Sequence, residues 1–170
     1  MMKLLMVCMG NVCRSPMAQM VTQHLAQKAG LARDLQIDSA GTHAARLKEP
    51  PDPRAKVALS ARGYPVGKTR SRKVVERDFD RYDLILAMDQ SNLNDLRKIC
   101  PNEHSHKLRL FLEFAGSLEN RDIPDPYYGN AEGFEQVLNL CEAGAHGETG
   151  SHETIAGVCK CACKCHNATV

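Results

Sequence analysis

The sequence predicts an α/β fold, an open and mostly four-stranded parallel sheet with helices on both faces. Short apolar runs of strand length alternate with segments of helical period, and helix start and stop signals separate them. Strands that alternate with helices in this way are typical of a doubly wound sheet. Ligands bind beyond the carboxyl ends of the strands in such sheets, so we expect the site in the loop after the first strand and in the segment after Asp89.

The first expected strand covers residues 3–7 (KLLMV). A helix should follow, because Ser15 is a suitable N-cap residue and Pro16 loses nothing by lacking an N–H at the first helical position. Apolar residues continue at helical spacing until Gly30, which is a stop signal. The start of the chain therefore reads as strand, tight loop and helix.

The alternation continues beyond this first unit. The other expected elements are a strand at 35–40, a helix from Asp52–Pro53 to Gly63, a strand at 84–88, a helix with Leu93, Leu96 and Cys100, a strand with Leu108, Leu110 and Leu112, and a helix with Phe134, Val137, Leu138 and Cys141. The basic run at 68–73 (KTRSRK) is interpreted as a solvated loop.

Length and charge exclude several classes of protein. The chain has 170 residues, with 22 Lys and Arg against 20 Asp and Glu, a balance that argues against a dedicated nucleic-acid or membrane binder. No apolar stretch approaches the roughly 20 residues of a membrane span. The apolar run at 4–7 is too short for a signal peptide, so we expect a cytoplasmic protein. We expect no cofactor and favour a monomer.

The composition changes near the end of the chain. We expect one domain over residues 1–143 and an irregular, poorly ordered tail rich in Gly and Cys over 144–170. Alternating thiolates in this tail could bind Zn or Cu(I), but their spacing is not that of a structural zinc site, so a disordered tail or an altered reading frame also stays open. The four cysteines concerned are Cys159, Cys161, Cys163 and Cys165.

The loop after the first strand carries the residues for phosphate chemistry. It reads CMGNVCRS from Cys8 to Ser15 and joins a strand to a helix, so its backbone N–H groups can point inward at the positive helix end. Gly10 allows the backbone to approach an oxyanion closely. Arg14 can hold two phosphate oxygens with its planar fork. The expected phosphate-binding residues are Met9, Gly10, Asn11, Val12, Cys13 and Arg14.

Cys8 is the expected nucleophile of this loop. A thiol among helix-terminal N–H groups and beside an arginine favours the thiolate form, which attacks phosphorus. Ser15 can donate a hydrogen bond to the sulfur and stabilise it as a leaving group. Asn11 tolerates a left-handed backbone and is expected to brace the loop. The alternative interpretation of Cys8 is an inert thiol at a strand end.

The loop from Cys8 to Pro16 resembles the motif Cys-x-Gly-Asn-x-Cys-Arg-Ser-Pro of the low-molecular-weight protein tyrosine phosphatases. The resemblance covers roughly residues 3–143. Four further segments resemble the family, at 38–42 (DSAGT), 51–55 (PDPRA), 83–89 (DLILAMD) and 125–129 (DPYYG). It implies a flavodoxin-like fold and a hydrolase that acts on tyrosine-phosphorylated proteins through a cysteinyl-phosphate intermediate.

The resemblance also implies roles for individual residues. Asp125 would be the general acid for the leaving phenolate and then the base that activates water. Tyr127 and Tyr128 would form the wall of a slot for the substrate ring. Ser39 would be the hydroxyl partner of Asn11.

Cys13 has a different implied role. In the family, a cysteine at this position can trap an oxidised nucleophile as a reversible disulfide. A small residue that merely fills the loop is the alternative.

Other activities stay open at this point. Protein-arginine phosphatases share the scaffold, but their loops resemble CTGNTCR, with Thr where this chain has the apolar Val12. Arsenate reductases on this scaffold need two relay cysteines near the middle of the chain, and residues 14–99 contain none. A metal-binding protein acting through the cysteine-rich tail is the alternative from another class.

Overall fold

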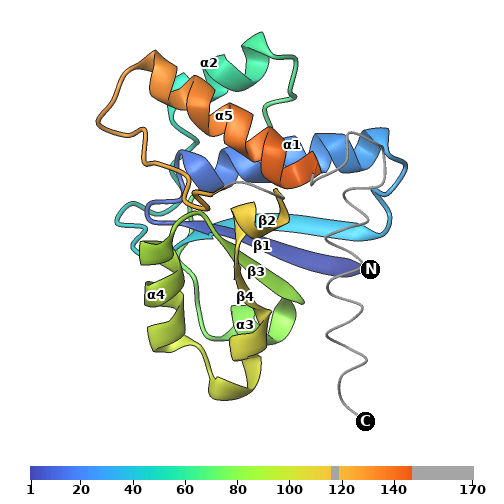
Figure 1. Cartoon of the computed structure of the whole chain (residues 1–170), viewed down its shortest axis with the longest axis vertical. Helices are drawn as coiled ribbons and strands as arrows, with labels where there is room; N and C mark the ends of the chain where they lie inside the picture. Colours follow the sequence, from blue (N-terminus) through green and yellow to red (C-terminus); the bar gives the residue numbers. More distant parts are fainter. Residues whose placement is uncertain (116–118, 147–170) are drawn as a thin grey trace.

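The computed structural model describes residues 1–115 and 119–146. Four parallel strands form one sheet in the order β2-β1-β3-β4, and their carboxyl ends lie on the left in Figure 1. The strands are β1 (Met2–Cys8), β2 (Leu35–Gly41), β3 (Leu84–Ala87) and β4 (Leu108–Leu110). The α-helices are α1 (Arg14–Lys28), α2 (Pro53–Ala61), α3 (Arg77–Arg81), α4 (Gln90–Ile99) and α5 (Ala131–His146), with 3₁₀ turns η1 (Asn102–Lys107) and η2 (Phe111–Phe114).

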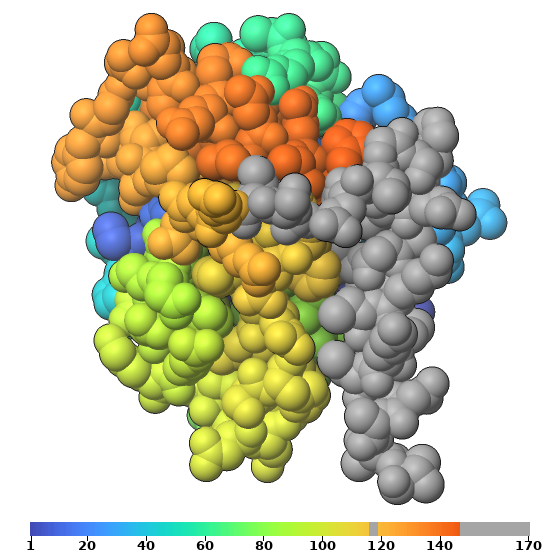
Figure 2. Space-filling model, in the orientation of Figure 1, coloured from blue at the N-terminus to red at the C-terminus, as the bar shows by residue number. Residues whose placement is uncertain are grey.

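Helices cover both faces of the sheet, which confirms the doubly wound prediction. Helices α1, α2 and α5 lie on one face, and α3 and α4 lie on the other (Figure 1). Alternate residues of β1 point to opposite faces, so Leu4 and Met6 enter the core beneath α1 and α5, whereas Leu5 and Val7 enter the core beneath α3 and α4. In the space-filling view, α5 forms much of the upper surface beside α2 (Figure 2).

The strand order places the end of β1 at the centre of the ligand-binding edge. β1 pairs with β2 over its whole length, to Cys8↔Gly41, and with β3 on its other side. The chain passes from β1 outward to β2 and then back to β3, so the switch point of the sheet lies directly beyond Cys8. The loop that follows, residues 8–15, is called the phosphate loop below.

Local signals placed α2 correctly, whereas the start of α1 differs from the expectation. Asp52 caps α2 by accepting a hydrogen bond from the Arg54 amide at 2.8 Å, and Pro53 is the first helical residue. α1 begins at Arg14, with Cys13 at the N-cap position and no capping side chain. Ser15 is therefore a helical residue rather than the cap, and its hydroxyl contacts the Cys8 sulfur instead.

The last strand and the last helix also differ from the expectation. β4 ends at Leu110, and Leu112 lies in η2 rather than in a strand. α5 continues through Gly144, where we expected a break, to His146. The reason is packing, since a Cβ on Gly144 would lie 2.7 Å from Cδ1 of the Phe111 ring and the helix approaches the ring this closely only without a side chain.

The rest of the predicted tail, residues 147–170, lies outside the described residues, together with Cys159, Cys161, Cys163 and Cys165. Within 1–115 and 119–146, no helix has the length and apolar character needed to cross a membrane.

Candidate active site

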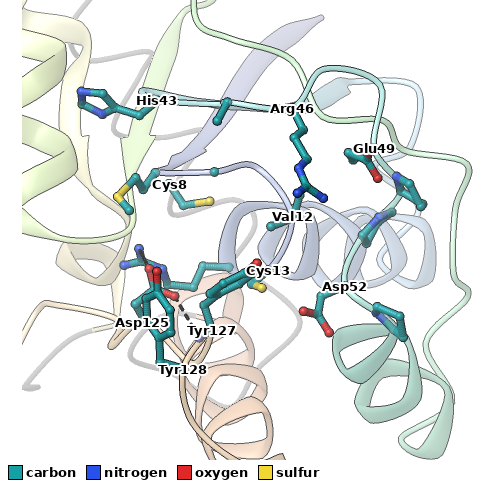
Figure 3. Close-up of a pocket in the computed structure, with 17 residues that line it drawn as sticks. Cys8, Val12, Cys13, His43, Arg46, Glu49, Asp52, Asp125, Tyr127 and Tyr128 are labelled. Carbon is teal, nitrogen blue, oxygen red and sulfur yellow. Dashed lines mark hydrogen bonds and ion pairs between the residues drawn. The ribbon is translucent and has the colours of Figure 1, made fainter.

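A cavity of about 510 Å³ opens at the carboxyl edge of the sheet (Figure 3). The phosphate loop forms its floor, the segment 43–53 forms one wall, and Asp125, Tyr127 and Tyr128 form the other. Figure 3 shows Cys8 and Val12 between these two walls. The fold therefore brings together the two motifs that lie more than a hundred residues apart in the sequence.

Cys8 lies at the end of β1 with only 2% of its surface exposed. Its sulfur accepts a hydrogen bond from the Asn11 amide at 3.3 Å and lies 3.1 Å from the Ser15 hydroxyl. The sulfur therefore has one amide donor and one hydroxyl neighbour that can donate to it, an arrangement that favours a thiolate. The inert-thiol alternative predicts apolar surroundings alone, whereas this sulfur has two polar neighbours.

The carbonyl groups of the phosphate loop are bonded away from the cavity. The carbonyls of Cys8 and Met9 accept hydrogen bonds from the amides of Thr42 and His43, both at 2.9 Å. The carbonyl of Val12 accepts one from the Asp52 amide at 2.8 Å. These three oxygens have partners outside the loop, and the loop leads into the N-terminus of α1, where backbone amides bind anions.

The backbone of Gly41 holds the phosphate loop from outside. A Cβ at this position would lie 2.6 Å from the Met9 carbonyl oxygen and 3.1 Å from the Asn11 nitrogen. Only glycine permits this approach, so the end of β2 packs directly against the phosphate loop and supports its backbone.

Arg14 is buried, with 3% of its side chain exposed, and is held by three oxygen partners. Its guanidinium donates to Asp89, to the Ile123 carbonyl at 3.0 Å and to Asp125 at 2.9 Å. Burial alone would lower the pKa of Arg14, but the negative charge of Cys8 and the hydrogen bond to Asp89 raise it overall. Arg14 is therefore a permanent cation directed between the nucleophile and Asp125.

Asp125 lies at the mouth of the cavity, where its second oxygen accepts a hydrogen bond from the Tyr127 amide at 3.1 Å. Tyr127 and Tyr128 form an edge-to-face pair with ring centroids 5.0 Å apart. Tyr127 is half-exposed and Tyr128 is 95% exposed, so both rings present surface to a substrate. The DPYYG loop (residues 125–129) thus combines a carboxylate with aromatic surface, as expected.

Arg54 ties the DPYYG loop to α2. Its guanidinium pairs with Asp52 at 2.9 Å and donates to the carbonyls of Tyr127 at 3.0 Å and Gly129 at 3.1 Å. The hydrogen bond from Arg54 lowers the pKa of Asp52, so that carboxylate stays charged. Cys13 lies beside it, and burial together with the charge of Asp52 raises the pKa of Cys13 to about 12. Cys13 is therefore a neutral thiol near neutral pH, which favours Cys8 over Cys13 as the nucleophile that attacks phosphorus.

The predicted partner of Asn11 was wrong. The Asn11 side chain donates to the Ser15 hydroxyl at 3.0 Å and accepts a hydrogen bond from the Arg72 amide at 2.9 Å. Ser39 instead donates to Gln19 at 2.7 Å, because its side chain faces α1. Asn11 does adopt the expected left-handed backbone, with φ of 57°.

Sequence reasoning pointed to the segment after Asp89 but missed other residues that support the site. Asp89 lies two residues beyond β3, where the carboxyl ends of neighbouring strands meet, and it accepts a hydrogen bond from Arg14. Ser71 and Arg72 lie in the basic run that we interpreted as solvated, yet Ser71 is buried and Arg72 is half-buried. Their partners come from distant segments, which no local pattern reveals.

Known proteins resemble the chain over most of its length. The family model described as low molecular weight phosphotyrosine protein phosphatase matches residues 3–150. A putative low molecular weight protein-tyrosine-phosphatase of Synechocystis is 40% identical over 142 residues, 83% of this chain and 90% of the relative. A human low molecular weight phosphotyrosine protein phosphatase is 36% identical over 140 residues, 81% and 87% of the two chains.

A crystal structure of a protein tyrosine phosphatase from Entamoeba histolytica has the same fold. It superposes with a TM-score of 0.86 at 34% identity and covers 94% of this chain and 98% of its own. The chain therefore belongs to the low molecular weight phosphotyrosine protein phosphatase family.

Proposed function

We propose that Cys8, Arg14, Ser15 and Asp125 carry out the hydrolysis of phosphotyrosine in this chain. Membership of the family makes the chain a protein-tyrosine phosphatase, a hydrolase of phosphate monoesters whose substrates are tyrosine-phosphorylated proteins. One observation carries the assignment of residues: the sulfur of Cys8 lies among donor groups while Arg14 links the floor of the cavity to Asp125.

The first step forms a phosphocysteine. The Cys8 thiolate attacks phosphorus, the S–P bond forms, and the P–O bond to the phenol breaks. Asp125 gives its proton to the departing phenolate oxygen. Arg14 and the amides of the phosphate loop (Met9 to Arg14) hold the three remaining oxygens and the charge that develops on them.

The second step releases phosphate. Asp125, now a carboxylate, takes a proton from a water molecule whose oxygen attacks phosphorus, and the S–P bond breaks. Ser15 donates a hydrogen bond to the sulfur, which leaves as a thiolate. The 3.1 Å separation of these two atoms supports this role.

Two substitutions test these roles. Cys8→Ser should abolish the hydrolysis of a phosphotyrosine peptide, whereas Cys100→Ser, at a half-buried cysteine far from the cavity, should not. Asp125→Asn should slow the peptide reaction by about 10²- to 10⁴-fold, the usual contribution of a general acid. It should slow p-nitrophenyl phosphate less, because that leaving group needs less protonation. Full activity of Cys8→Ser would overturn the proposal.

The cavity supports an aromatic phosphoester over phosphoarginine. Val12 places an apolar side chain on its floor, and Tyr127 and Tyr128 supply flat rings beside it. Turnover of a phosphotyrosine peptide should exceed that of a matched phosphoarginine peptide. The reverse ranking would assign the chain to arginine phosphatase activity.

We also propose that the chain acts as a monomer in the cytoplasm. All four cysteines in the described part of the chain are unbridged, which suits a reducing compartment; they are Cys8, Cys13, Cys100 and Cys141.

We further propose that Cys13 protects Cys8 from over-oxidation. Peroxide would oxidise Cys8 to a sulfenic acid, and attack by the Cys13 sulfur would form a disulfide and release water. After peroxide treatment, thiol reductant should restore wild-type activity but not the activity of Cys13→Ser.

A further inference from the structure

Asn11 is the middle link of a hydrogen-bond chain that ends on the nucleophile. The nitrogen of its side-chain amide donates a hydrogen bond to the Ser15 hydroxyl, which lies 3.1 Å from the Cys8 sulfur. The oxygen of the same side chain accepts a hydrogen bond from the backbone amide of Arg72 at 2.9 Å. A left-handed backbone at a residue other than glycine persists only where its surroundings hold it, and the amide of Arg72 is one of the groups that hold the buried Asn11.

The side chain of Arg72 is itself fixed by two carboxylates from different elements. It pairs with Asp78 of α3 at 2.8 Å and with Asp38 of β2 at 3.1 Å. The buried Tyr82 donates its hydroxyl to the same Asp38 oxygen at 2.8 Å. Burial alone would lower the pKa of Arg72, but the hydrogen bond to Asp78 and the charge of Asp38 raise it overall.

The backbone of Arg72 meets the phosphate loop through a second route. Its carbonyl accepts a hydrogen bond from the Gly41 amide at 2.9 Å, and Gly41 forms a single parallel bridge with Lys73. Gly41 is the residue whose backbone touches Met9 and Asn11. A displacement of Arg72 is therefore transmitted to the loop both through Asn11 and through the end of β2.

We propose that Arg72 is a positioning residue of this phosphatase, which acts on Cys8 through Asn11 and Ser15. This inference rests on the proposed function. A fork that binds two carboxylates holds the backbone of Arg72 in one place, and lysine cannot reproduce it. Without that anchor, the amide of residue 72 is free to move away from Asn11, and the donors around the sulfur lose their alignment.

The test compares Arg72→Lys with Arg70→Lys, the same substitution at an exposed arginine two residues earlier. On a phosphotyrosine peptide, Arg72→Lys should lower kcat by about ten- to a hundredfold, the scale of a small misplacement of catalytic groups. KM should change little. Alkylation of Cys8 by iodoacetate at neutral pH should slow in Arg72→Lys and stay at the wild-type rate in Arg70→Lys. Thermal melting verifies that both variants are folded. Lysine is chosen because its positive charge still neutralises Asp38 and Asp78, which limits the loss of stability.

A double-mutant cycle separates positioning from general stabilisation. If Arg72 acts mainly through Asn11, the loss of kcat in Asn11→Ala/Arg72→Lys should be well below the product of the losses in the two single variants, and what remains reports the route through Gly41. Multiplied losses in the double variant, or wild-type kcat in Arg72→Lys, would overturn the inference. Failure of the proposed function is a different result, because wild-type protein would then not hydrolyse the peptide at all.

Discussion

Replacement of Asp89 by asparagine isolates one support of Arg14. One oxygen of Asp89 caps α4 by accepting the Asn92 amide at 2.6 Å, and the other accepts from Arg14. Asparagine is an equally good helix cap, so Asp89→Asn keeps the first contact and removes the second. A lost hydrogen bond to a charged group costs about 1.5–3 kcal/mol, which corresponds to about ten- to a hundredfold in rate.

The lower end of that range applies to this variant. The Ile123 carbonyl and Asp125 still hold the guanidinium of Arg14 after the change. We therefore expect kcat/KM for a phosphotyrosine peptide to fall by about tenfold.

Asp122→Asn is the matched control. It removes a charge beside the same end of α4, where Asp122 accepts a hydrogen bond from the Gln90 amide at 2.9 Å and does not contact Arg14. Steady-state kinetics below the melting temperature of both variants measure the difference. Equal values of kcat/KM for the two variants would refute the reasoning about Arg14.

Three further predictions concern packing, the wall of the cavity and pH. Gly144→Ala should lower the free energy of unfolding in urea, since the new Cβ would lie only 2.7 Å from Cδ1 of the Phe111 ring. Gly133→Ala in the same helix is the control: its Cβ meets only ordinary contacts of 3.5 Å or more, so it should stabilise the protein by up to about 1 kcal/mol. Ser71→Ala should raise KM more than it lowers kcat, because the Ser71 hydroxyl holds the cavity wall: it donates to the Arg46 carbonyl at 2.7 Å and accepts from the Glu49 amide at 2.9 Å. An unchanged KM would contradict this. Folding raises the pKa of Cys13 from 9.0 to about 12, and this stabilises the folded state fully only below pH 9.0. The contribution is lost as the pH rises to about 12. Over this interval the free energy of unfolding should therefore fall less in Cys13→Ala than in wild type.

The fold was predictable because its signals are local. The alternation of apolar runs with helical segments identifies the parallel sheet, and Asp52–Pro53 and Gly63 mark the two ends of α2. Gly144 shows where such signals fail. A glycine late in a helix reads as a stop, and only the tertiary contact with Phe111 explains why α5 continues through it.

The phosphate loop was also predictable, because its residues are contiguous and each has a chemical reason to be there. The supports of that loop were not predictable to the same degree. Asn11 could be singled out for its tolerance of a left-handed backbone, but its acceptor role depends on a backbone amide 61 residues later. The basic run seemed solvated because Asp38 and Asp78, which neutralise Arg72, are distant in the sequence.

Trapping of the covalent intermediate tests the central claim most directly. A phosphotyrosine peptide labelled in its phosphate is mixed with the enzyme and quenched within one turnover. Peptide mapping should then locate the label on Cys8 in wild type, with more label in Asp125→Asn because the second step also needs that carboxylate. Cys8→Ser should carry no label. Label on any other residue, or turnover by wild type without a labelled intermediate, would contradict the role of Cys8.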